Sequence, residues 1–278
     1  MGIVTMNLTV AVLGAGKIGD AVARSIAKSD GVSKVFVTKR NISSASLAWT
    51  KNFSNKVEIL AENRKAGEKA DIILVSVKAG DAKHVLSEIS GASSGKIVIS
   101  LMAAISIRRL EAALPQAKIV RSMPNIAATI GEAITAYTPG KRLDEKDIGQ
   151  VQFVLSCFGD YIEVPESLMD AVTALSGSGP AYIAMMIEAM VSAGLKVGIP
   201  RDVAFKLSTK TLTGTANLLS QNNMHPAELR DAVTTPAGTT IAGIYELEKG
   251  SLRTSIMNAV EAATAAAEKV AKKFEQEG

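Results

Sequence analysis

Cysteine, histidine and aromatic residues are scarce in this chain of 278 residues. It has two histidines and a single cysteine, Cys157, which excludes an intrachain disulfide framework and leaves too few ligands for a structural zinc site. Aromatic residues make up only 4% of a sequence that is 47% hydrophobic, so the core must consist mainly of Ala, Val, Ile, Leu and Met. This composition favours helices that pack closely against a parallel sheet.

The net charge is small, and long apolar runs are absent. The formal net charge is only +4 and the basic residues are scattered, which argues against nucleic-acid binding. No apolar run reaches the length of a membrane span, and the N-terminus lacks the regions of a signal peptide. We therefore expect a soluble, cytoplasmic protein that binds neither nucleic acid, nor membrane, nor metal.

The secondary-structure pattern changes near Pro165. Before it, short β-branched segments alternate with helical patterns, which indicates βαβ units and a parallel sheet. The predicted strands are 8–13, 34–37, 71–77, 96–101, 118–121 and 133–137, with a possible edge strand at 161–164. A helix over 144–158 begins at an acidic N-cap and ends at Gly159.

After Pro165 nearly every segment is helical. The predicted helices are 167–176, 181–197, 201–222, 239–249 and 252–274. The Ala-rich stretch 259–271 suits a helix packed against neighbours, with a coiled coil as the alternative. We predict a doubly wound, mostly parallel, Rossmann-like α/β domain over 1–164, followed by an all-α domain over 165–278.

A glycine-rich turn, Gly14-Ala15-Gly16-Lys17-Ile18-Gly19, lies between the first predicted strand and a helical run. In that context the spacing is typical of dinucleotide binding: Gly14 permits a tight turn, Gly16 lets the pyrophosphate approach, and Gly19 lets helix and strand pack closely. An ordinary strand-to-helix turn is the alternative.

The residues after the second strand bear on the choice of cofactor. A site for NAD usually has an acid there for the ribose 2′-hydroxyl, but this chain has Thr38-Lys39-Arg40-Asn41. The cations Lys39 and Arg40 suit a 2′-phosphate. We predict NADPH as cofactor, with NADH possible; a solvated basic turn is the other interpretation.

A second small-residue turn, Thr235-Pro236-Ala237-Gly238-Thr239-Thr240, precedes an apolar helical stretch. Free backbone N–H groups and hydroxyls should converge there and favour an anion. The turn resembles the loop of the pyrroline-5-carboxylate reductase family, which typically has Ser-Pro-Gly-Gly-Thr-Thr. Ala237 replaces the first glycine, which matters only if that backbone needs a positive φ.

Other segments match the family in the same order. Val77-Lys78-Ala79 stands where the family has Val-Lys-Pro, Arg121-Ser122-Met123-Pro124-Asn125 matches Arg-x-Met-Pro-Asn, and Leu175–Tyr182 contains the matching Ser178. The family often has a proline after Asn125, which is absent here. Simpler roles remain for three residues: Asn63 as a polar residue before a helix, Pro124 as a strand terminator, and Ser178 as a helix cap.

The resemblance implies an NADPH-dependent reductase of 1-pyrroline-5-carboxylate that makes L-proline. Hydride addition to a protonated cyclic imine needs little acid–base help, so positioning is the main task. By resemblance, the Thr240 hydroxyl meets the ring nitrogen, while Thr235, Gly238, Thr239 and Ser178 bind the substrate. The implied cofactor contacts are Gly14, Gly16, Lys17, Ile18, Gly19, Lys39, Arg40, Asn63, Val77, Lys78, Ala103, Met123, Pro124 and Asn125.

The resemblance also implies a homodimer that can assemble into a larger ring, in which the turn 235–240 of one subunit, here called the threonine loop, completes the cofactor crevice of the other. Two alternative functions remain open. One is a related dehydrogenase acting on a β-hydroxyacid or another imine, whose catalytic lysine would be Lys196, Lys206 or Lys210. The other is a non-catalytic cofactor-binding paralogue, suggested by Ala79, Ala237 and the missing proline.

Overall fold

The computed structural model describes residues 6–40 and 48–276. Contacts divide the chain into two units, one comprising 1–177 with 263–278 and the other 178–262. The predicted boundary at 164/165 falls earlier in the chain. Residues 166–177 belong with the α/β unit because Met169 and Ala174 are buried and Arg121 forms ion pairs with Glu166 and Asp170.

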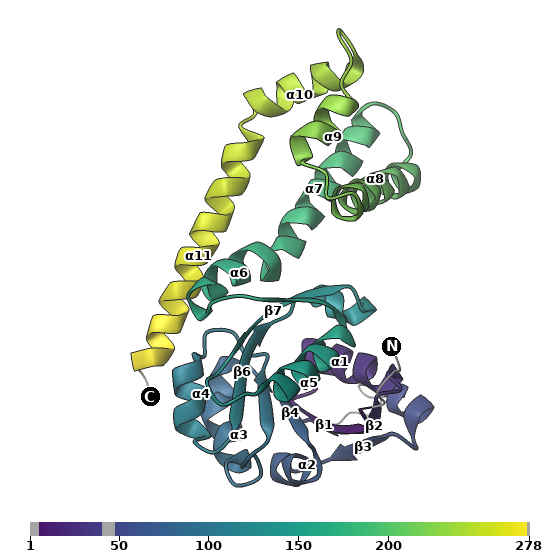
Figure 1. The fold of residues 1–278 in the computed structure, drawn as a ribbon. Coiled ribbons are helices and arrows are strands. Elements are labelled where there is room, and N and C mark those ends of the chain that lie inside the picture. Colours follow the sequence, from purple (N-terminus) through teal and green to yellow (C-terminus); the bar gives the residue numbers. More distant parts are fainter. Residues whose placement is uncertain (1–5, 41–47, 277–278) are drawn as a thin grey trace. The chain divides into compact units, whose positions relative to one another are not determined.

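The first unit is built on a sheet whose described strands follow the order β3-β2-β1-β4-β5-β6-β7-β8 (Figure 1). The strands are β1 Leu8–Leu13, β2 Val32–Thr38, β3 Val57–Leu60, β4 Ile72–Val75, β5 Ile97–Ser100, β6 Lys118–Met123, β7 Ala133–Pro139 and β8 Gly159–Glu163. Within the described residues, only the pair β6 and β7 is antiparallel. The predicted mostly parallel sheet is therefore confirmed; β3 is a strand that the sequence pattern missed.

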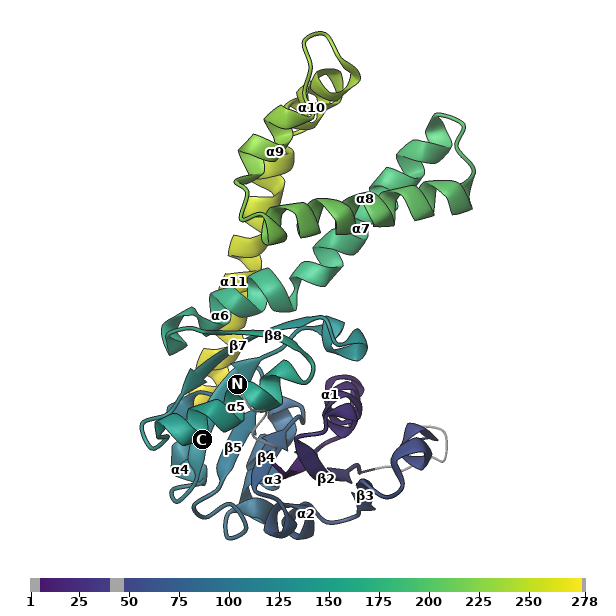
Figure 2. The ribbon, with the colours of Figure 1, turned by 45° about the vertical axis from the view of Figure 1, so that its right-hand side comes forward.

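Helices cover both faces of this sheet (Figure 2). Alternate residues of β1 point to opposite faces: Val10 and Val12 join the core with α1 Lys17–Lys28 and α5 Glu145–Ser156. Ala11 and Leu13 join the core with α2 Asn63–Lys69, α3 Ala82–Ile89 and α4 Ile107–Ala113. The short segments of this unit are η1 Ala48–Phe53, η2 Ala79–Asp81, η3 Ile126–Ile130, η4 Glu166–Leu168, α6 Met169–Val172 and the π-helical turn Thr173–Gly177.

Two local expectations are corrected, and one alternative role is not borne out. Gly159 does not end α5 but begins β8. Its φ of 143° favours glycine, and a Cβ there would lie 2.1 Å from the Ala133 carbonyl oxygen. The predicted helix 167–176 is a succession of 3-10, α and π turns. Ser178 stands before α7, but its side chain makes no capping hydrogen bond in the described part of the chain.

The second unit is helical. It contains α7 Gly179–Lys196, α8 Arg201–Gln221, α9 Pro226–Ala232, α10 Thr239–Lys249 and the first part of α11 Leu252–Gln276. α7 and α8 approach closely, since a Cβ on Gly194 would lie 2.8 Å from the Ala204 Cβ. Large apolar side chains stay exposed in the single chain, among them Met185, Tyr245 and Met257. None of the described helices has the length and apolar character needed to cross a membrane.

Candidate functional site

The three motif glycines occupy three different environments. Gly14 has a φ of 89°, and a Cβ there would lie 2.5 Å from Val77 Cγ1. A Cβ on Gly19 would lie 2.2 Å from the carbonyl oxygen of Gly14, so this glycine lets α1 pack on the turn. Gly16 has no heavy atom within 4 Å of a Cβ position, which leaves open space beside the start of α1. The first N–H groups of a helix have no acceptor within it, so the open space adjoins hydrogen-bond donors.

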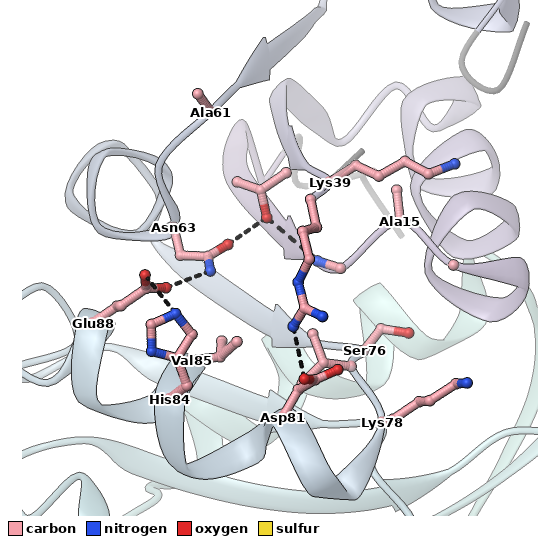
Figure 3. Close-up of a pocket in the computed structure, with 15 residues that line it drawn as sticks. Ala15, Lys39, Ala61, Asn63, Ser76, Lys78, Asp81, His84, Val85 and Glu88 are labelled. Atoms are coloured by element: carbon pink, nitrogen blue, oxygen red, sulfur yellow. Dashed lines mark hydrogen bonds and ion pairs between the residues drawn. The ribbon is translucent and has the colours of Figure 1, made fainter. Parts of the chain in front are cut away.

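A pocket of about 740 Å³ opens beside this turn, at the carboxyl ends of β1, β2 and β4 (Figure 3). In a doubly wound sheet this is the edge at which ligands bind. Its lining residues are Gly14, Ala15, Gly16, Thr38, Lys39, Arg40, Ala61, Asn63, Ser76, Val77, Lys78, Asp81, His84, Val85 and Glu88. The structure thus brings seven of the predicted cofactor residues together: Gly14, Gly16, Lys39, Arg40, Asn63, Val77 and Lys78.

A chain of hydrogen bonds crosses one wall of the pocket. The Thr38 hydroxyl accepts from the backbone N–H of Gly14 at 3.3 Å and donates to Asn63 Oδ1 at 2.5 Å. Asn63 Nδ2 in turn donates to Glu88 Oε2 at 2.6 Å, and His84 Nε2 lies 3.2 Å from Glu88 Oε1. The carboxamide of Asn63 is therefore held in one orientation by partners on both sides, as Figure 3 shows.

An ion pair lies on the same pocket wall. One guanidinium nitrogen of Arg40 lies 2.7 Å from Asp81 Oδ1. The hydrogen bond to Asp81, reinforced by its charge, raises the pKa of Arg40. The neighbouring Asn41 lies outside the described residues.

Sequence reasoning missed the contribution of α3 to the pocket. Asp81 precedes this helix, and His84, Val85 and Glu88 follow at spacings that place them on one helical face. The signal was present as polar residues at positions 81, 84 and 88, just after the turn that ends β4. His84 is exposed on α3 and contacts Glu88.

Other predicted cofactor residues do not line this pocket. They are Lys17, Ile18, Gly19, Ala103, Met123, Pro124 and Asn125. Gly19 packs behind the turn, and Asn125 Oδ1 accepts a hydrogen bond from the Ala127 N–H at 3.2 Å, which is a local capping role. Ala103 lies in an exposed turn after β5. Cofactor contacts by these residues stay predictions.

In the helical unit, the threonine loop leads into α10. The Gly238 N–H donates to the Thr235 carbonyl oxygen at 3.0 Å, while Thr239 and Thr240 form the first turn of the helix. Ala237 has a φ of 55°, a conformation that favours glycine. The departure from the family pattern therefore falls on a residue whose backbone is in the left-handed region.

The lysines that the related dehydrogenase would use share the exposure of Thr235 and Thr239. Lys196, Lys206 and Lys210 are all exposed in the single chain. Within the described residues, no group of three or more His, Cys, Asp or Glu side chains could hold a metal ion.

The doubly wound sheet, the glycine turn and the pocket at the carboxyl ends of its strands define a Rossmann-like protein with an attached helical unit. Residues 166–270 match the family model described as pyrroline-5-carboxylate reductase dimerisation. Residues 9–104 match the model described as NADP oxidoreductase coenzyme F420-dependent.

Individual relatives agree with these matches. A curated pyrroline-5-carboxylate reductase from Synechocystis sp. is 44% identical over 172 residues, which cover 62% of this chain and 64% of that protein. The crystal structure of a Plasmodium falciparum pyrroline carboxylate reductase with NADP bound is 30% identical, with a TM-score of 0.85, and the match covers 96% of this chain and 99% of that one. A pyrroline-5-carboxylate reductase from Coxiella burnetii is 26% identical, with a TM-score of 0.87 and coverage of 95% and 98%.

The chain belongs to the pyrroline-5-carboxylate reductase family. Its alignments with the curated relatives span less than two thirds of their length, for example 64% of the Synechocystis protein and 60% of one from Methanosarcina acetivorans.

Proposed function

We propose that this protein is an NADPH-dependent pyrroline-5-carboxylate reductase that forms L-proline. The observation that carries the proposal is the match over 96% of the chain to a reductase structure with NADP bound. The pocket beside the glycine turn supports it from within this chain.

The pocket residues fit a dinucleotide. Gly16 leaves room for a pyrophosphate beside the N–H groups that begin α1, and a side chain at this position would fill that room. Lys39 and Arg40 supply positive charge after β2, where a 2′-phosphate is recognised. Asn63, fixed between Thr38 and Glu88, would contact the adenosine portion. When bound, the reduced nicotinamide supplies the hydride.

The threonine loop would hold the substrate. Backbone N–H groups at the start of α10 and the hydroxyls of Thr235 and Thr239 suit the substrate carboxylate, and Gly238 keeps the loop tight. The Thr240 hydroxyl would bind the ring nitrogen. A protonated cyclic imine is already electrophilic, so these residues act by fixing the carbon that accepts hydride in a reactive position, which can contribute several kcal/mol.

We also propose a homodimer formed through the helical unit. Several large apolar side chains of this unit are more than half exposed in the single chain, such as Met185 and Tyr245, both at 68%, and Met257 at 64%. The number of large exposed apolar side chains in this unit favours an interaction surface. Residues 166–270 match a dimerisation model, which supports the same conclusion. Sedimentation at micromolar concentration should give a dimer or a larger assembly; a single monomer species would contradict this proposal.

The deciding experiment measures NADPH oxidation with 1-pyrroline-5-carboxylate, and with a β-hydroxyacid and NADP⁺ in the reverse direction as the control. We expect turnover with the imine alone. Turnover with the hydroxyacid alone would favour the related dehydrogenase. Tight NADPH binding without turnover on either substrate would favour the non-catalytic paralogue.

A further inference from the structure

The tertiary structure supplies an acid to a part of the pocket where the local sequence has none. Asp81 is remote in sequence from β2, yet its carboxylate lies 2.7 Å from the guanidinium of Arg40, one of the two cations that follow that strand. Both residues line the pocket, and Figure 3 shows Asp81 pointing into it from the start of α3.

The two partners favour different nucleotides. A carboxylate in this part of a dinucleotide site suits a ribose 2′-hydroxyl, because it accepts the hydroxyl hydrogen, whereas Arg suits a 2′-phosphate. A 2′-phosphate would share the Arg40 guanidinium with Asp81, which engages one of its nitrogens and neutralises part of its charge, and the phosphate would also lie within the negative field of that carboxylate. A 2′-hydroxyl meets neither penalty.

We propose that Asp81 is a specificity-determining residue that limits the preference for NADPH and keeps NADH usable as a second cofactor. This inference rests on the proposed cofactor site, but not on the identity of the reduced substrate. Asp81 acts by engaging Arg40 and by placing a negative charge beside the position that the phosphate would take.

The role of Asp81 is separable from the stability of the fold. Its side chain makes no capping hydrogen bond to α3 in the described part of the chain, and the turn there is closed by backbone bonds such as Asp81 N–H to the Lys78 carbonyl at 2.9 Å. The ion pair is solvent-accessible, with side-chain exposures of 71% for Arg40 and 36% for Asp81. Exposed pairs of this kind contribute little to stability, so Asp81→Asn should fold normally.

The test measures the dissociation constants of NADP⁺ and NAD⁺ by calorimetry at low ionic strength for the wild type and Asp81→Asn. We expect the ratio of Kd for NAD⁺ to Kd for NADP⁺ to rise by about three- to tenfold, the effect of one nearby exposed charge. Glu68→Gln is the matched control, because Glu68 forms a comparable exposed pair with Arg64 at 2.8 Å outside the pocket. This control should leave the ratio unchanged.

A double-mutant cycle tests whether Asp81 changes the Kd ratio through Arg40. In an Arg40→Met background, Asp81→Asn should change the ratio by less than half as much on a logarithmic scale, because no guanidinium is left to be released. A ratio that stays constant or falls in Asp81→Asn would overturn the proposal, and so would an equal rise in both backgrounds. If the ratio rises as expected but the protein reduces no cyclic imine, the proposed reductase activity fails and the inference about Asp81 stands.

Discussion

A pair of glycine substitutions separates packing from cofactor binding in the glycine turn. In Gly19→Ala the new Cβ would lie 2.2 Å from the backbone oxygen of Gly14 and 3.0 Å from Ser76 Oγ. In Gly16→Ala the new Cβ meets no heavy atom within 4 Å. The same chemical change, three residues apart, therefore falls in two opposite environments.

The magnitudes follow from those distances. In Gly19→Ala, helix and turn must separate by roughly 1 Å to restore van der Waals contact, and because one clashing atom belongs to the backbone, the cost should be about 2 to 3 kcal/mol. For a chain of this size the melting temperature should fall by roughly 4 to 12 °C. Gly16 has a φ of −78° and a ψ of −162°, which alanine adopts easily, so Gly16→Ala should keep or slightly raise the stability.

Two measurements are needed for each variant: thermal denaturation without nucleotide, and the dissociation constant of NADP⁺. We expect Gly16→Ala to melt like the wild type and to bind NADP⁺ at least about tenfold more weakly, because its Cβ takes the space in which a pyrophosphate approaches the backbone. If Gly19→Ala melts at the wild-type temperature, the packing argument is wrong. If Gly16→Ala binds NADP⁺ normally, the pocket beside this turn is not the pyrophosphate site.

Three further predictions concern other parts of the chain. Thr240→Ala should lower kcat/KM for the imine while the Kd of NADP⁺ stays constant; full activity in steady-state kinetics would remove Thr240 from the mechanism. Ala237→Gly should raise the unfolding free energy by up to about 1 kcal/mol, since the φ of 55° costs an alanine more than a glycine, and unchanged or lower stability in urea denaturation would show that the loop carries no such strain. Burial raises the pKa of Asp147, but hydrogen bonds from Lys118 and from the Asp144 backbone outweigh this effect and hold the pKa below 3.8. The stability that this carboxylate contributes should therefore be present above pH 3.8 and be lost as the pH falls through the lowered pKa. In Lys118→Met the loss of stability should begin at a higher pH, because the Lys118 hydrogen bond no longer opposes the effect of burial on the Asp147 pKa. Superimposable stability profiles of variant and wild type between pH 3 and 7 would contradict this explanation.

Local patterns were enough for the architecture. The apolar run 8–13, bounded by turn residues, indicates a buried strand, and the glycine spacing after β1 indicates a turn whose conformation depends on residues a few positions apart. β3 escaped because four residues with a partly exposed face give too weak a period. The alternative role of Ser178 as a cap of α7 is not borne out, because its backbone already has helical angles, with a φ of −86° and a ψ of −23°.

The sequence by itself determined most of the sheet, the longer helices and the glycine turn 14–19, because each depends on short-range periodicity and backbone freedom. Only the tertiary structure decided the polar wall of the pocket, where Asp81 meets Arg40 and Glu88 meets Asn63 across separations of 41 and 25 residues. No local pattern encodes such pairs, because they form only when crossover helices fold back over a common sheet edge and bring distant charges within hydrogen-bond distance. The sequence shows correctly that no acid follows β2 directly, but the folded pocket has one beside Arg40, which is Asp81.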